Sequence, residues 1–136
     1  MGTTGDRGTF RDVTVSFDAA IAKLPEELKK EGFGVVTEID LKKTFAAKLG
    51  VDFRRYTIFG ACNPTLAHGA VSTDPHVGVL LPCNVVLYER DDGKVVVGAI
   101  DPMQSIGVGG DGRFADVARD VQARLGRVLD GMSALR

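Results

Sequence analysis

The sequence predicts an α+β fold, in which a single compact domain builds one sheet, backs it with helices and ends in a long amphipathic helix. Three observations support this prediction. Short runs of β-branched and aromatic residues alternate with segments whose apolar residues recur at helical spacing. Capping residues and glycines stand at the ends of several of these segments. The length of 136 residues suits one domain, which at this size buries roughly two-thirds of its unfolded surface.

The composition narrows the class of protein. Hydrophobic residues make up 44% of the chain and charged residues 26%, as in an ordinary globular domain. The formal net charge of −1 provides no field that attracts nucleic acid. We find no export signal and no run near the ~20 apolar residues of a membrane span, so we expect a cytoplasmic protein without nucleic-acid or membrane partners. Residues 1–8 are expected to be a flexible leader, and residues 9–136 the domain.

The domain is predicted to begin with a strand and a helix. Residues 9–15 alternate loosely between β-branched or aromatic and polar side chains, which favours a strand. Asp18 is the expected cap of the helix, and Gly32 its end. Pro25 lacks a backbone donor, so we expect either a kink there or a later start of the regular helix. The apolar stripe of this helix has three members at helical spacing: Ile21, Leu24 and Leu28.

A strand, a short helix and a further strand are predicted next. Residues 33–39 and residues 53–61 are rich in β-branched and aromatic side chains, as strands are. Between them, Leu41–Leu49 carries apolar residues four apart and is predicted to be a short helix. Asp40 stands at its N-cap position and Gly50 at its C-terminal stop.

Another short helix is expected directly after the strand at residues 53–61. Asn63 can cap a helix over residues 64–71, and Pro64 fits its first position, where the missing N–H is not needed. Cys62 then lies just before a helix N-terminus, whose partial positive charge favours a thiolate or a bound anion.

The second half is predicted to supply further strands. Apolar runs at residues 77–81 and 85–89 are expected to form one long strand with a bend or bulge at residues 82–84, because proline cannot complete an interior ladder. A turn at residues 91–94 then leads through a hairpin into a strand over Val95–Ile100.

The clearest helix of the sequence closes the chain. Apolar residues line one side of it from Phe114 to Met132 and charged residues line the other, so it is expected to cover the sheet. The glycine-rich loop at residues 107–112 formally satisfies a G-x-G-x-x-G pattern. It lies well after the preceding strand and carries Asp111, which would repel phosphate, so we do not expect a dinucleotide site.

Two cysteine motifs are the most informative feature for function. Cys62 and Cys83 are the two cysteines of the chain, and each is followed by Asn and has a proline within two residues. Each stands at the end or the start of an apolar run, so the fold can bring both thiols to one end of the sheet. A ligand, metal or redox site requires such a meeting. Cysteine is also among the most often buried residues, so the alternative is that both thiols pack in the core.

The two histidines suggest a metal site only weakly. Cys62, Cys83, His68 and His76 together offer the ligands of a tetrahedral zinc site. The spacing of the cysteines matches no metal signature, and His68 lies too far along its helix to neighbour Cys62. Zinc is therefore a disfavoured alternative.

Four stretches of the sequence together resemble the family called domain of unknown function 302, over about residues 10–131. The stretches are Gly32-Phe33-Gly34-Val35, Gly60-Ala61-Cys62-Asn63-Pro64, Leu80-Leu81-Pro82-Cys83-Asn84-Val85-Val86 and Ile100-Asp101-Pro102. The resemblance implies a compact α+β domain with an antiparallel sheet backed by helices, commonly a dimer, and it implies no particular reaction. Neither histidine matches a position of the family pattern. The positions that do match are Cys62, Asn63, Pro64, Pro82, Cys83, Asn84, Asp101 and Pro102.

The expected function is the binding of a small ligand, a metal ion or haem in a pocket with two cysteines. The cofactor is left open. One alternative is a thiol-dependent redox enzyme in which Cys62 attacks and Cys83 resolves, and another is an interaction domain with structural cysteines, so the sequence leaves enzyme status open. The expected ligand-binding residues share one pocket only if the strand ends cluster. They are Cys62, Asn63, Pro64, Cys83, Asn84 and Asp101.

A homodimer is expected from the strands themselves. Residues 77–81, 85–87 and 95–97 are almost continuously apolar, which is typical of strands buried on both faces. The predicted helices supply one covering layer. A second copy of the chain is therefore the expected cover for the other face.

Overall fold

The sheet dominates the structure, a computed structural model that describes residues 2–4, 7–108 and 112–136. Over these residues the chain forms a six-stranded sheet in the order β1-β2-β6-β5-β4-β3. Every neighbouring pair is antiparallel. The strands are β1 (Gly2–Thr4), β2 (Gly8–Val13), β3 (Gly34–Asp40), β4 (Tyr56–Cys62), β5 (Cys83–Glu89) and β6 (Val95–Ile100).

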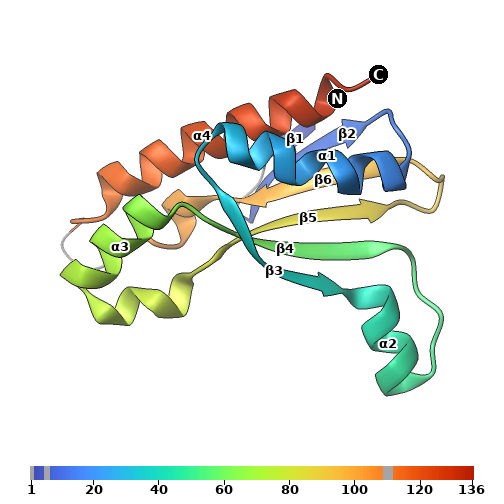
Figure 1. Ribbon diagram of the computed structural model, residues 1–136, viewed down its shortest axis with the longest axis horizontal. Helices are drawn as coiled ribbons and strands as arrows, with labels where there is room; N and C mark the ends of the chain where they lie inside the picture. Colours follow the sequence, from blue (N-terminus) through green and yellow to red (C-terminus); the bar gives the residue numbers. More distant parts are fainter. Residues whose placement is uncertain (1, 5–6, 109–111) are drawn as a thin grey trace.

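Two long helices back this sheet on one face (Figure 1). These are α1 (Phe17–Lys30) and α4 (Ala115–Ser133). The other helices lie toward the ends of the sheet and are α2 (Leu41–Leu49), α3 (Pro64–Thr73) and two short 3-10 segments, η1 (Pro75–Leu80) and η2 (Pro102–Gln104). The predicted fold class is confirmed: one antiparallel sheet, helices behind it and a long amphipathic C-terminal helix.

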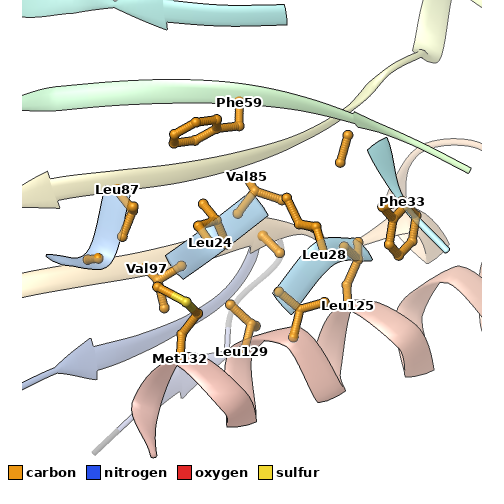
Figure 2. Packing of buried hydrophobic residues seen from close by; sticks show 14 of the residues in the cluster. Leu24, Leu28, Phe33, Phe59, Val85, Leu87, Val97, Leu125, Leu129 and Met132 are labelled. Atoms are coloured by element: carbon orange, nitrogen blue, oxygen red, sulfur yellow. The ribbon is translucent and has the colours of Figure 1, made fainter. Parts of the chain in front are cut away.

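The core lies between the sheet and the two long helices. Leu24 and Leu28 of α1 are fully buried, as are the strand residues Val85, Leu87 and Val97 on which the helices pack. Figure 2 shows these side chains interdigitating with those of α4. The contributions of α4 come from one stripe of the helix, which includes Val121, Leu125, Val128, Leu129 and Met132.

Strand register decides which side chains reach that core. Phe59 and Val85 are opposite each other and face the helices, so the neighbouring pair, Ile58 and Val86, faces the other way. We call this second side the open face. Its side chains are mostly half-buried and include Phe10, Tyr56, Ile58, Val86 and Tyr88.

Most of the helix boundaries in the structure are set by local capping bonds. Asp40 caps α2 by accepting from Lys43 N at 3.0 Å, and Gly50 ends it with φ 65°, as predicted. In α1 the cap is Ser16, whose hydroxyl accepts from Ala19 N at 3.1 Å, whereas Asp18 lies inside the first turn. The prediction of Asp18 as the cap is therefore wrong. The helix runs through Pro25, which is exposed.

One predicted strand is absent from the described residues. Residues 75–80 form the 3-10 segment η1 in place of the expected strand at residues 77–81, because the Asp74 carboxylate accepts from His76 N and Pro75 occupies a first helical position. Val79, in the middle of that apolar run, is 87% exposed. The strand β5 begins only at Cys83, after a cis Leu81–Pro82 peptide bond.

The N-terminal prediction also needs correction. Residues 2–4, assigned to a leader outside the domain, form β1 and pair with β2 at the edge of the sheet. Residues 1, 5 and 6 of that leader lie outside the described residues, as do residues 109–111 of the glycine-rich loop. Within the described part of the chain, none of the helices has both the length and the apolar character needed to cross a membrane.

The packing of α1 on the sheet gives a stability prediction. Leu24→Ala removes a side chain that is 0% exposed, so we expect the free energy of unfolding to fall by about 2–5 kcal/mol. Urea denaturation followed by circular dichroism measures it. The matched control is Val79→Ala, which should change stability by no more than about 0.5 kcal/mol. Equal effects of the two substitutions would contradict the packing described above.

Candidate functional site

An apolar pocket of about 270 Å³ lies where the ends of β4 and β5 meet α3 and α4. Its walls come from segments that are far apart in the sequence, including the residues before β5 and the loop before α4. Most of the wall is aliphatic. The residues on which the chemistry depends are Ala61, Cys62, Asn63, Ala67, Pro82 and Cys83.

The register of β4 and β5 brings the two cysteines together. Ala61 of β4 is directly opposite Cys83 of β5, so Cys62 is one residue from the position opposite Cys83. Both side chains line the pocket, and both are free thiols. Cys83 is buried and Cys62 is half-buried. The two cysteines thus line the same pocket at one end of β4 and β5.

Electrostatics distinguishes the two thiols. Burial, with a smaller contribution from the nearby Cys62, raises the pKa of Cys83 from its ordinary value of 9.0 to about 11. An apolar wall cannot solvate a thiolate, so Cys83 keeps its proton at neutral pH.

Asn63 fixes the entrance of α3 next to the pocket. Its side-chain oxygen accepts from Leu66 N at 3.2 Å and caps the helix, as predicted. Its amide nitrogen lies against Gly32, where an added Cβ would be only 2.9 Å from it. Gly32 has φ 84°, and Arg124 of α4 donates to the carbonyl of the preceding Glu31 at 2.9 Å. The C-terminus of α1, the N-terminus of α3 and the middle of α4 therefore meet at one junction.

Three of the predicted ligand-binding residues lie elsewhere. Asn84 follows Cys83 in the strand, so it faces the open face and is exposed, in a separate depression beside Tyr56 and Val86. Asp101 caps η2 by accepting from Met103 N at 2.9 Å and also accepts from Gln122 at 2.9 Å. Pro64 is exposed at the first position of α3. The expectation of one pocket containing all six motif residues is wrong for these three.

The four-ligand metal site is not formed either. His68 and His76 are exposed on α3 and η1, and neither lines the pocket with the cysteines. Across the described ranges, no three side chains of His, Cys, Asp or Glu converge in a way that could hold a metal ion.

Sequence reasoning missed part of the pocket wall. Ala67 and Ala70 line it from α3, where the pattern of small residues on one side of a short helix was the available signal. Gly60 was missed as a packing site. An added Cβ there would be 2.1 Å from Thr37 Oγ1 and 2.7 Å from Pro82 Cγ, so glycine lets Pro82 approach the strand.

Comparisons with known proteins agree with this fold. Residues 10–132, which include the pocket and both cysteines, match the family model described as "Domain of unknown function DUF302". The crystal structure of an uncharacterized conserved DUF302 protein from Bacillus stearothermophilus is similar with a TM-score of 0.83 and 31% identity, over 90% of this chain and 95% of that chain. An uncharacterized protein of Aquifex aeolicus (strain VF5) is 38% identical over 47 residues. That match spans 35% of this chain and a third, 33%, of the relative.

The first prediction for the site concerns thiol reactivity. At pH 7 we expect iodoacetamide to modify Cys62 at least ~10 times faster than Cys83, because Cys83 is buried and its raised pKa keeps it protonated. Mass spectrometry of tryptic peptides follows both sites in one sample. The variants Cys62→Ala and Cys83→Ala confirm the assignment. Slow labelling of both cysteines at equal rates, seen only after denaturation, would contradict it.

The second prediction concerns stability at high pH. The folded chain holds the Cys83 proton up to a pKa of about 11, whereas the unfolded thiol loses it near the ordinary value of 9.0. The contribution of the Cys83 proton to the free energy of unfolding is therefore complete below pH 9. It is lost as the pH rises toward 11, at up to roughly 1.4 kcal/mol per pH unit. Denaturation of the natural chain and of Cys83→Ala at several pH values measures it. If the free energy of unfolding changed with pH in the same way for the natural chain and for Cys83→Ala, the raised pKa would be refuted.

Proposed function

The chain belongs to the DUF302 family, and because that family's name specifies no activity, we propose a function from the site: the pocket binds a small, neutral, mainly apolar molecule. The observation that carries the proposal is that two thiols from neighbouring strands line one apolar pocket of about 270 Å³. Ligand sites of proteins are concave and mostly apolar, with a few polar groups that fix orientation. Here Cys62 and Asn63 are such groups.

The size of the cavity supports a molecule of one or two rings. An apolar cavity of roughly 150 Å³ accepts benzene, and drug-sized ligands occupy pockets above about 300 Å³. The polarity of the wall supports a neutral one. Among the described residues that line the pocket none carries a charged side chain, and a buried charge without a partner is costly.

The metal and haem alternatives receive less support. A metal ion needs deprotonated sulfur or neutral imidazole as a ligand. The raised pKa of Cys83 opposes deprotonation of its thiol. His68 and His76 are exposed and lie outside the pocket wall, so they supply no imidazole to it. The donor set of the pocket therefore supports a metal ion or haem less well than a neutral ligand.

The redox alternative meets a related difficulty. After Cys62 attacks a substrate, Cys83 must attack as a thiolate to resolve the mixed species. With a pKa of about 11, Cys83 offers very little thiolate at neutral pH. Binding is the better-supported function, and the free thiols suit a reducing, cytoplasmic setting, which is part of this proposal.

The proposal includes a homodimer formed through the open face. Ile58, Val86 and Phe10 form an apolar row across that face, and Tyr56 and Tyr88 stack beside it with ring centroids 5.1 Å apart. Monomeric proteins rarely leave a contiguous apolar patch of this kind to solvent. A second copy of the chain would cover it.

Titration with a matched pair of probes tests the pocket. We expect 2-naphthol to bind, and naphthalene-2-sulfonate to bind at least ~10 times more weakly because the wall has no cation to pair with its charge. Ala67→Trp, which fills the cavity from α3, should abolish 2-naphthol binding, as measured by probe fluorescence. Ala22→Trp, on the exposed side of α1, is the control and should bind normally. Equal binding by both variants, or preference for the sulfonate, would refute the proposal.

A further inference from the structure

The helix α2 is the element whose place in the fold is least explained by the single chain. None of its nine residues is buried. An isolated helix of this length is marginal in water, and helices in proteins are stabilised mainly by packing an apolar side. We call the segment from Ile39 to Phe53, which contains α2 and its flanks, the arm.

The arm is nevertheless held firmly in shape. Lys42 Nζ donates to the Asp52 carboxylate at 2.8 Å and to the Phe53 carbonyl at 2.7 Å, which closes the segment on itself. The Asp40 cap and the left-handed Gly50 fix the two helix ends. The arm therefore has a defined shape, with its helix capped at both ends and its two flanks joined through Lys42.

The arm also carries apolar side chains that its own chain leaves in solvent. Ile39 is 44% exposed, Val51 46% and Leu49 68%. In Figure 1, α2 projects beyond the end of β3, away from α1 and α4. It therefore stands at the border of the open face and does not contribute to the core between sheet and helices.

An aromatic row joins the arm to the open face. Phe45 of α2 packs edge-on against Phe53 at 5.1 Å between centroids, and Phe53 lies 6.4 Å from Tyr56. Tyr56 in turn stacks on Tyr88, its partner in the register of β4 and β5. The aromatic side chains of the arm are thus continuous with those of the open face.

The area of this surface can be compared with the area that a stable dimer interface buries. The five longer strands have 6 or 7 residues each. Strands of that length are about 20 Å long and lie about 4.8 Å apart, so the sheet face alone is on the order of 500 Å². A stable interface buries roughly 800 Å² on each partner. The sheet face alone falls short of this area, and the arm supplies an adjoining apolar surface.

We propose that the arm is a dimer clasp: α2 and its flanks pack on the open face of a second copy of this chain, whose arm packs back in return. The proposal rests on the homodimer above and names the element that forms it. In a two-fold dimer the same patch serves on both subunits, so a chain with an unburied apolar arm beside an uncovered apolar face contains both halves of the contact. Ile39, Leu49 and Val51 then leave solvent by packing on the partner.

Sedimentation velocity over a range of micromolar concentrations tests the clasp. The test variant is Leu49→Asp with Val51→Asp, two changes at exposed positions that leave the monomer core intact. Because symmetry places each change twice in the interface, we expect the dimer dissociation constant to rise at least ~100-fold. The control is Ala123→Asp, which puts the same charge on the exposed side of α4 and should leave the dimer unchanged.

The outcomes separate the clasp from the dimer and from the pocket. A natural chain that sediments as a monomer would overturn the homodimer and the clasp together. A natural chain that dimerises as tightly as the arm variant would overturn the clasp alone, since the copies would then meet elsewhere. Loss of the dimer in the arm variant but not in Ala123→Asp supports the clasp. Binding of 2-naphthol by these same samples reports separately on the pocket.

Discussion

The pairing of β4 with β5 at the centre of the sheet is the constraint on which the other features depend. A single register directs Phe59 and Val85 into the core and Tyr56 and Tyr88 to the open face. The same register puts Ala61 beside Cys83 at the end of the ladder. A shift by one residue would exchange the two faces, remove the core contacts and separate the thiols from the cavity. Core, open face and pocket are thus set by one alignment.

Local signals explain how much of the fold could be predicted from sequence. Asp40 with Gly50, and Asn63 with Pro64, define the ends of their helices through bonds within a few residues, and those helices appear where expected. The apolar run at residues 77–81 was wrongly predicted to be a strand, because hydrophobicity does not distinguish strand from helix in so short a segment. The carboxylate of Asp74 and the ring of Pro75 were the local signals that decided it.

The candidate site was only partly predictable, for a different reason. Cys62, Asn63 and Cys83 reach the pocket, but nearness along the chain suggested the same for Asn84, and strand alternation turns that residue to the opposite face. Asp101 is engaged in capping η2, a role that depends on the residues after it. The contributions of α4 to the pocket wall depend on the packing of distant segments, which the sequence pattern does not specify.

The junction of Gly32, Asn63 and Arg124 has a mechanical consequence. Arg124 ties α4 to the end of α1, and Asn63, the cap of α3, lies close against Gly32, so the three helices meet beside the pocket. A side chain at position 32 would have to displace the Asn63 amide, which caps the first turn of α3 beside the pocket. Position 32 lies outside the pocket wall but next to its helix start, so binding of the proposed ligand would be sensitive to a substitution there.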